Sequence, residues 1–205
     1  PQSIRLKGYP CEEHFVTTKD GYILAMHRIP WGKQGKGRGQ LIYLLIRALM
    51  FGLTNVRGGD YSRNHTHLSP SSKEFWDFSW DEMAKYDLPK MIDYIVKHTK
   101  HKKVDYVGHS MGTTIFFALM SSQPEYNKKI NHMIALAPVG TVSHIDTMVK
   151  YLSHFYKQLK LCLNMLGDYE IIPNRNSTLI KLFNYVCNLY KTTRKTCENL
   201  LFMIV

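Results

Sequence analysis

The chain has 205 residues, of which 44% are hydrophobic and 12% aromatic, so it can bury a sizeable core and its composition is not that of a disordered protein. Its net charge of +11 raises the possibility of a nucleic-acid or anionic-membrane partner. The densest basic run, residues 97–103, has no helix-turn-helix, zinc-knuckle or stacking-aromatic pattern beside it. We therefore interpret the charge as a solvated basic surface and expect no nucleic-acid partner.

Neither a transmembrane helix nor a signal segment is predicted. The most apolar run, residues 41–53, is interrupted by Arg47 and is too short to span a bilayer. The sequence lacks an initiating Met and a charged-then-apolar segment at Pro1, so we interpret it as a mature or clipped piece.

The cysteines and the glycosylation sequons bear on the cellular compartment. No C-x-x-C spacing occurs among the four cysteines, which argues against a zinc site, and we expect no metal or cofactor. N-x-S/T sequons begin at Asn64 and Asn176. Together with an even cysteine count, they favour a glycoprotein on the secretory or lysosomal route.

The first predicted elements form a hairpin. Strand-like runs at residues 14–18 and 22–29 flank Lys19-Asp20-Gly21, and an Asp-Gly pair favours a tight turn because positive φ is accessible there. Residues 30–39 have the composition of a Gly/Lys-rich surface loop. Residues 41–45 then have the pattern of a fully buried strand of a parallel sheet.

Two helices are predicted before the central motif. Ser79 and Glu82 fit a capping box at the start of the first helix. The second is expected to begin at Asp87-Leu88-Pro89, with proline in its first turn. It would continue along one apolar face that contains Met91, Ile92, Ile95 and Val96.

The central motif is Gly108-His109-Ser110-Met111-Gly112, a G-x-S-x-G sequence. A short run that we expect to be a buried strand precedes it, containing Val104, Tyr106 and Val107, and an apolar helical run follows at residues 113–120. Strand, motif and helix in this order form the nucleophile elbow of an α/β-hydrolase.

Each position of the elbow then has an expected role. Ser110 is the predicted nucleophile, on a strained turn above the ends of the strands. The backbone N–H of Met111, at the start of the helix, would be one oxyanion donor. Gly108 and Gly112 are expected because a side chain there would collide across the turn.

The order of elements predicts the fold class and its division. Residues 133–138 form another short buried strand, so strands and helices alternate. This predicts an α/β-hydrolase fold, a mostly parallel sheet with helices on both faces, over residues 1–140. After Thr141, residues 151–166 and 177–189 are helix-like with no strand between them, so we interpret residues 141–205 as the beginning of a helical cap.

Several segments together resemble the acid lipases, the family of gastric and lysosomal acid lipases and their insect relatives. The resemblance covers almost the whole chain, and residues 1–65 resemble the lipase-associated N-terminal region. The matching segments are Gly8–His14, Thr18–Leu24, Asn55–Gly58, Tyr61–Asn64, Phe75–Met83, Lys85–Pro89, Tyr106–Ser110 and Ala135–Val139.

The resemblance implies a serine ester hydrolase that acts on neutral lipids, either triacylglycerols or steryl esters, at a lipid–water interface. His109 would pack at the elbow instead of serving as the base. Cys187 and Cys197 align with a cysteine pair of the acid-lipase cap, which predicts a disulfide; the alternative is two free thiols. Cys11 and Cys162 are interpreted as unpaired.

The sequence departs from the family in two ways, and we interpret it as truncated with an internal gap. Where the family has His-Gly-Leu-Leu, whose backbone supplies the second oxyanion donor, this chain has residues 46–52. The expected Asp and His of a triad are absent: His132, His144 and His154 follow Ser110, but none has the family's histidine context. We therefore expect turnover at background level for these 205 residues.

Two other hypotheses stay open at this point. One is a catalytically inactive, lipid-binding relative, and the other is a basic nucleic-acid-associated protein, which has only the net charge in its favour. The sequence does not indicate an oligomeric state.

Overall fold

The computed structural model describes residues 1–32 and 51–141. The chain divides into two units, one with residues 1–70 and 77–140 and the other with residues 71–76 and 141–205. Of the second unit, the described part includes the 3-10 helix η1 (Lys73–Trp76). The strand expected at 41–45, the cap helices, and the proposed sites at Asn176, Cys187 and Cys197 lie outside the described residues.

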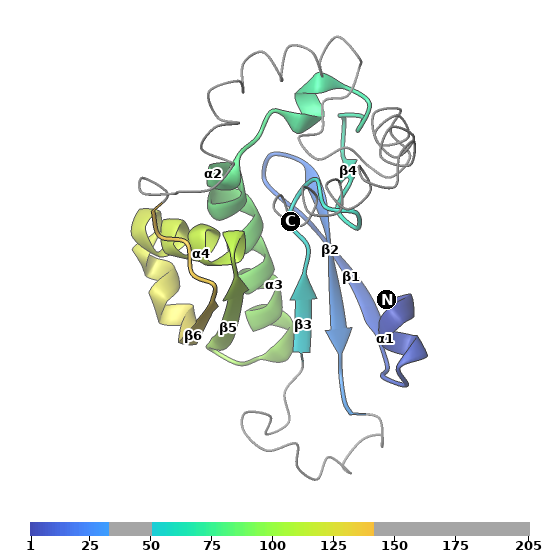
Figure 1. The fold of residues 1–205 in the computed structure, drawn as a ribbon, viewed down its shortest axis with the longest axis vertical. Helices are drawn as coiled ribbons and strands as arrows, with labels where there is room; N and C mark the ends of the chain where they lie inside the picture. Colours follow the sequence, from blue (N-terminus) through green and yellow to red (C-terminus); the bar gives the residue numbers. More distant parts are fainter. Residues whose placement is uncertain (33–50, 142–205) are drawn as a thin grey trace, which may run out of the picture. The chain divides into compact units, whose positions relative to one another are not determined.

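The first sheet of the larger unit contains the predicted hairpin (Figure 1). Strand β1 (Glu12–Thr17) pairs antiparallel with β2 (Tyr22–Ile29), which confirms this prediction. Gly21 in the turn has φ +99°, and a Cβ there would lie 2.6 Å from Thr66 Oγ1, so glycine is needed. Two further strands, β3 (Phe51–Thr54) and β4 (Asn64–His65), also pair antiparallel with β2.

A parallel strand pair forms the second sheet. Strand β5 (Val104–His109) pairs with β6 (Ile130–Leu136), and the helix α4 (Met111–Ser122) and the 3-10 helix η3 (Pro124–Lys129) connect them. Parallel neighbours require such a crossover, so the predicted strand–helix–strand unit is confirmed.

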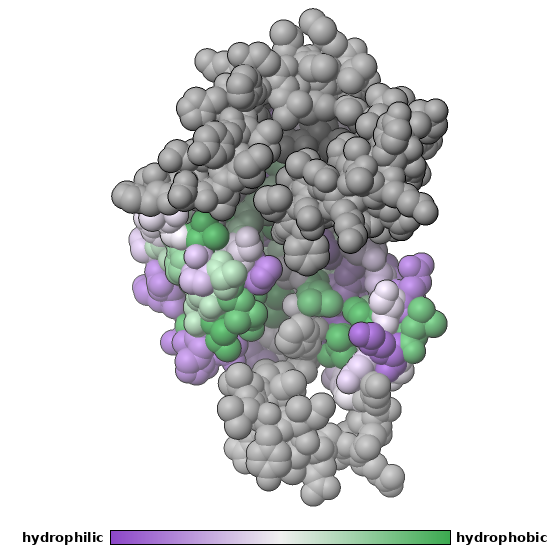
Figure 2. All heavy atoms as spheres, viewed as in Figure 1, coloured by the Kyte–Doolittle hydropathy of each residue, from purple (hydrophilic) through white to green (hydrophobic). Residues whose placement is uncertain are grey.

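The predictions that Val107 and the strand at residues 133–138 are buried are wrong. Val107 is 50% exposed. In the second strand, Met133, Ile134 and Ala135 are only partly buried and residues 136–138 are exposed, Leu136 to 49%. Tyr106 stacks on Phe116 of α4, with ring centroids 4.7 Å apart, and neighbouring side chains of a strand point to opposite faces. Val107 is therefore on the face away from α4, which no described element covers. Figure 2 shows hydrophobic side chains at the surface in this region.

A single helical run precedes β5, where the sequence predicts two helices. It consists of α2 (Trp80–Glu82), the π-helical turn η2 (Met83–Asp87) and α3 (Leu88–Thr99). The predicted capping box is confirmed, since Ser79 N donates to Glu82 Oε2 at 2.6 Å and Asp81 N to Ser79 Oγ at 3.1 Å.

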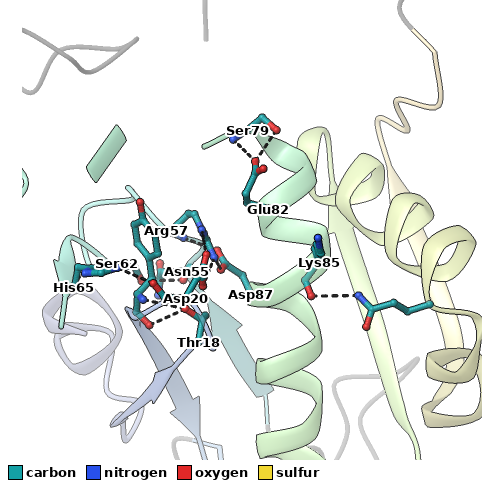
Figure 3. A network of polar contacts seen from close by, with 12 residues as sticks. Thr18, Asp20, Asn55, Arg57, Ser62, His65, Ser79, Glu82, Lys85 and Asp87 are labelled. Carbon is teal, nitrogen blue, oxygen red and sulfur yellow. Dashed lines mark hydrogen bonds and ion pairs between the residues drawn. The ribbon is translucent and has the colours of Figure 1, made fainter. Parts of the chain in front are cut away.

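The run continues through the proline because a partner outside the helix replaces a lost hydrogen bond. Pro89 has no N–H, so it cannot donate to the carbonyl of Lys85 four residues earlier. Gln123 Nε2 donates to that carbonyl at 3.2 Å. A dashed line at Lys85 in Figure 3 marks this hydrogen bond. The helix therefore passes the position where the sequence predicts a new start, with Pro89 in the first turn of α3.

The core between the helical run and α4 supports the elbow. It contains the buried residues Met83, Ala84, Leu88, Ile92, Ile115, Phe116, Leu119 and Tyr126. Fully burying a Leu, Ile or Phe side chain stabilises a fold by about 1.5–3 kcal/mol. The helix α3 also contacts β1 and β5, so it packs against both sheets of this unit. Within the described residues no helix is long and apolar enough to cross a membrane.

Candidate active site

Ser110 occupies a strained turn between β5 and α4. Its backbone has φ 50° and ψ −118°, a conformation that costs a non-glycine residue on the order of 1–3 kcal/mol. The residue is exposed, and its N–H donates to the carbonyl of Leu136 at the end of β6 at 3.0 Å. Strand, strained serine and helix therefore occur in the order that the sequence predicts.

The two glycines of the motif differ in how closely they are packed. A Cβ on Gly108 would lie 2.9 Å from Tyr106 Cε1 and 3.2 Å from the backbone of Gly112, so the expected collision is confirmed there. A Cβ on Gly112 would meet Tyr106 Oη at 3.5 Å, which is ordinary contact. The prediction that Gly112 must be glycine for the same reason is wrong, because the close approach is made by its backbone to Gly108.

Met111 is the first residue of α4. The first N–H groups of a helix have no partner within it, and the helix dipole places partial positive charge there. The Met111 N–H is therefore suited to an oxyanion, which stays the expected role of this group.

Two threonines at the start of α4, which the sequence reasoning treated only as part of an apolar run, connect the elbow to the segment after β6. Thr113 Oγ1 donates to the carbonyl of Ser110 at 2.6 Å and accepts from the N–H of Val139 at 2.9 Å. Thr114 Oγ1 donates to the carbonyl of Val139 at 2.8 Å. Thr113 is completely buried.

A pocket of about 220 Å³ with both polar and apolar lining lies beside the elbow, between β3 and β5. Its lining residues are Thr54, Val56, Leu88, Met91, Tyr106, Val107, Gly108, His109, Met111, Gly112 and Ile115. Burial raises the pKa of Tyr106 to about 12, so its hydroxyl stays protonated and donates to the carbonyl of Gly112 at 2.9 Å. His109, expected to pack at the elbow, is exposed and lines this pocket.

His132 lies at the wrong end of the sheet to serve Ser110 as a base. Its Nδ1 lies 2.9 Å from Asp105 Oδ1, and this hydrogen bond lowers the pKa of Asp105. Asp105 is near the start of β5 and Ser110 follows the end of that strand, about 16 Å along it at roughly 3.3 Å per residue. The prediction that His132 is a surface residue is confirmed, since it is exposed; His144 and His154 lie outside the described residues.

A buried charge network, which the sequence reasoning missed, supports one wall of the pocket (Figure 3). Arg57 Nε and a terminal nitrogen donate to Asp87 Oδ1 at 2.9 and 2.7 Å, and the Arg57 N–H donates to Asp87 Oδ2 at 2.9 Å. The guanidinium also donates twice to Asp20, at 2.7 and 3.1 Å, and lies 4.0 Å over the ring of Tyr22. The neighbours in sequence, Val56 and Leu88, both line the pocket.

Burial and pairing oppose each other in this network. Burial raises the pKa of Asp87 above its ordinary value, although the hydrogen bonds and charge of Arg57 lower it. Burial opposes the charge of Arg57, but its hydrogen bonds to Asp87 and Asp20 outweigh burial and raise its pKa above the ordinary value. Burial also raises the pKa of Asp20, yet the hydrogen bonds from Arg57 and Thr18 bring it below 3.8. All three residues fall in segments that carry the family resemblance, but no spacing in the sequence indicated that they meet.

Two further predicted positions lie in the described part of the chain. Asn64 is exposed on β4, and its glycosylation stays a prediction. Cys11 has a free thiol there. The residues described include no group of three or more His, Cys, Asp or Glu side chains that could hold a metal ion.

Comparison with known families agrees with this geometry. Residues 52–167 match the alpha/beta hydrolase fold family, and residues 1–45 match the partial alpha/beta-hydrolase lipase region. The chain belongs to the alpha/beta hydrolase fold family. Residues 46–51 of this chain match neither pattern, and they fall in the stretch where the sequence departs from the acid lipases.

The chain is similar to several lipases. It is 40% identical to lipase member K of Homo sapiens over 232 positions, which cover 99% of this chain and 57% of the relative. It is 39% identical to the gastric triacylglycerol lipase of Homo sapiens (99% and 57% covered) and 43% identical to that of Mus musculus (74% and 45% covered). The resemblance to the acid lipases is thereby confirmed.

The chain spans about half the length of the curated relatives that it matches. The alignment to lipase member K covers 232 positions whereas the chain has 205 residues. That relative therefore has internal positions with no counterpart here, in agreement with the gap expected from the sequence.

Proposed function

We propose that this hydrolase cleaves carboxylic esters of neutral lipids, triacylglycerols or steryl esters, with Ser110 as its nucleophile. The proposal rests on the backbone conformation of Ser110. This exposed non-glycine residue has φ 50° and lies between the parallel strand β5 and the helix α4. Such strain persists where the surrounding structure maintains it, which is typical of catalytic turns. Nothing in the fold of β5 and α4 otherwise requires a serine at this position.

In the proposed reaction, Ser110 Oγ attacks the ester carbonyl carbon, and the Met111 N–H stabilises the negative charge on the carbonyl oxygen. The alcohol leaves with a proton, and water then releases the acid from the acyl-serine. A base must take the serine proton, and among the described residues no histidine is hydrogen-bonded to Ser110 Oγ. In this fold the acid and histidine of the triad follow the nucleophile in the chain.

The choice of lipid esters rests on the relatives and on apolar surface near the elbow. Two of the similar proteins are named gastric triacylglycerol lipases. Met111 and Val107 are about half exposed and line the pocket beside the elbow. Apolar side chains exposed beside a reacting serine suit a substrate presented at a lipid–water interface. The relatives and the sequons together favour the secretory or lysosomal route.

A second candidate function is lipid binding without turnover. Residues 46–51, which match neither family pattern, replace the turn expected to supply the second oxyanion donor. Loss of one such donor costs about 3 kcal/mol of transition-state stabilisation, or 10²–10³ in rate.

Labelling with a fluorophosphonate ester tests the nucleophile directly, because it requires attack by the serine but no turnover. In a full-length version that carries the triad acid and histidine of this fold, we expect one equivalent of label on the Ser110 peptide, identified by mass spectrometry, and none in Ser110→Ala. Ser121→Ala, an exposed serine of the same helix, is the matched control and should label like the wild type. Label that persists in Ser110→Ala would overturn the assignment. An assay of the labelling-competent protein with emulsified triacylglycerol then distinguishes a lipase, which hydrolyses the ester, from a protein that only binds lipid.

A further inference from the structure

Two adjacent strained turns lie at the carboxyl ends of β5 and β6. Ser110 has φ 50° and Ala137 has φ 47°, and both are non-glycine residues. A positive φ in such residues costs free energy and persists only where neighbouring contacts maintain it. The contacts around these two turns are therefore informative about what holds the nucleophile.

Three hydrogen bonds join the two turns, and the hydroxyl that accepts one of them donates a fourth bond within the elbow. The Ser110 N–H donates to the Leu136 carbonyl, and Thr114 Oγ1 donates to the Val139 carbonyl. Thr113 Oγ1 donates to the Ser110 carbonyl at 2.6 Å and accepts from the Val139 N–H at 2.9 Å. A hydroxyl can donate and accept at one atom in this way, whereas a methyl group can do neither. The side chain of Thr113 is completely buried, so water does not replace either partner.

The Ser110 carbonyl belongs to the same peptide group as the Met111 N–H. Because a trans peptide is planar, its C=O and N–H point in opposite directions. The Ser110 carbonyl accepts from the backbone N–H of Thr113 at 2.9 Å as well as from its hydroxyl at 2.6 Å. Any residue at this position could supply the backbone bond, whereas the hydroxyl adds the shorter bond and the connection to Val139. The two bonds together set the direction of the Met111 N–H. Rotation of this peptide group would turn the N–H away from the space next to Ser110 Oγ.

We propose that Thr113 is a positioning residue whose hydroxyl orients the Ser110–Met111 peptide group and thereby the oxyanion donor, and connects it to the turn at Ala137. The proposal rests on the proposed function, because it assigns a task to the surroundings of the same serine. It makes the start of α4 and the segment after β6 parts of one scaffold.

The test compares three variants in fluorophosphonate labelling of the same full-length version. Thr113→Val keeps the shape but lacks the hydroxyl, Thr113→Ser keeps the hydroxyl, and Thr114→Val removes only the bond to Val139. We expect Thr113→Val to lower the second-order rate constant of labelling by roughly 10–100-fold. This decrease should not exceed the decrease in rate caused by removing an oxyanion donor. Thr113→Ser and Thr114→Val should stay within about threefold of the wild type.

An NMR measurement separates orientation from general destabilisation. In the labelled wild type, the Met111 amide proton should move downfield on hydrogen bonding to the phosphonyl oxygen, and this shift should be lost in Thr113→Val. If Thr113→Val does not fold, Thr113→Cys, with a similar volume and a weak donor, should show an intermediate loss of rate.

The outcomes distinguish the inference from the function on which it rests. The role of Thr113 would be overturned if Thr113→Val, or Thr113→Cys where that variant is used, labels at the wild-type rate with the Met111 shift intact. Ser110 would then remain the nucleophile. A wild-type protein that does not label at Ser110 would overturn the proposed function and this inference together.

Discussion

Arg57 and Asp87 are joined by three hydrogen bonds, of which two come from the guanidinium and one from the backbone N–H of the arginine. The side chain of Asp87 is completely buried and that of Arg57 is 1% exposed. Because neither charge can be solvated where it lies, each depends on the other. The pair attaches the segment after β3 to the beginning of α3, and residues on both sides of this contact line the pocket.

Asp87→Asn is expected to destabilise the protein strongly. Removing one member of a buried ion pair costs about 3–5 kcal/mol when the other charge is left unpaired. Arg57 would keep only its two hydrogen bonds to the partly exposed Asp20, so we expect a loss toward the lower end of this range. Asp20→Asn is the matched control, because Asp20 is 30% exposed and water can replace part of its interaction with Arg57. The free energy of unfolding, measured by urea titration, should fall much further for Asp87→Asn. Equal losses for the two variants would contradict the account.

The stability of the protein is expected to decrease as the pH falls below about 6.5, in part because of His27. This residue is 4% exposed, and its Nδ1 lies 3.3 Å from Asn55 Nδ2. Burial, and then the positively charged N-terminus, hold the pKa of His27 below its ordinary 6.5. Protonation therefore favours the unfolded chain, so the contribution of His27 is full above pH 6.5 and is lost as the pH falls. Urea titrations at pH 7, 6 and 5 should show a weaker pH dependence for His27→Gln than for the wild type, and parallel curves would exclude this role.

Gly108→Ala and Gly112→Ala should differ in effect although both glycines belong to the same motif. The methyl group at 108 would lie 2.9 Å from a ring atom of Tyr106, which stacking on Phe116 holds in place. We expect a loss of about 1–3 kcal/mol and slower labelling of Ser110 for Gly108→Ala. Gly112→Ala meets ordinary contact in a helix and should be neutral or stabilising by up to about 1 kcal/mol. Thermal unfolding and labelling rates of the two variants check both expectations. If Gly108→Ala is as stable as the wild type and labels at the same rate, the packing described for Tyr106 is wrong.

Gln123→Ala should cost about 0.5–1.5 kcal/mol through the loss of the donor to the Lys85 carbonyl. The cost should decrease in a Pro89→Ala background, because the N–H of alanine is able to donate to the same carbonyl. A double-mutant cycle of Gln123→Ala and Pro89→Ala measures this coupling. Additive effects would show that the two donors do not share the carbonyl.

Local patterns were predicted well from the sequence because each depends on residues that are close in the chain. The Asp20-Gly21 turn, the Ser79–Glu82 capping box and the strand–serine–helix order at Ser110 all lie within a few residues, and each was found. The resemblance to acid lipases added the family, which the comparisons confirm.

Contacts between distant segments were not predictable in the same way. Arg57, Asp20 and Asp87 come from three separate segments, and neither charge nor spacing indicates that they meet. Val107 was expected to be buried because it is apolar, but burial depends on which elements cover each face of the sheet. The role of the Thr113 hydroxyl was not predicted, because the residue lies in an otherwise apolar run. Its partners are a backbone carbonyl and a backbone N–H, which every sequence supplies and no motif indicates.

The network around Arg57 also bears on the order in which the chain folds. Its carboxylate partners are 37 residues earlier and 30 residues later in the sequence. A chain that had closed only one of these two long loops would hold a desolvated cation with half of its hydrogen bonds unmade. The hairpin, the segment after β3 and the start of α3 are therefore expected to become ordered in one cooperative step, late in folding, after the locally encoded turn and helix cap have formed.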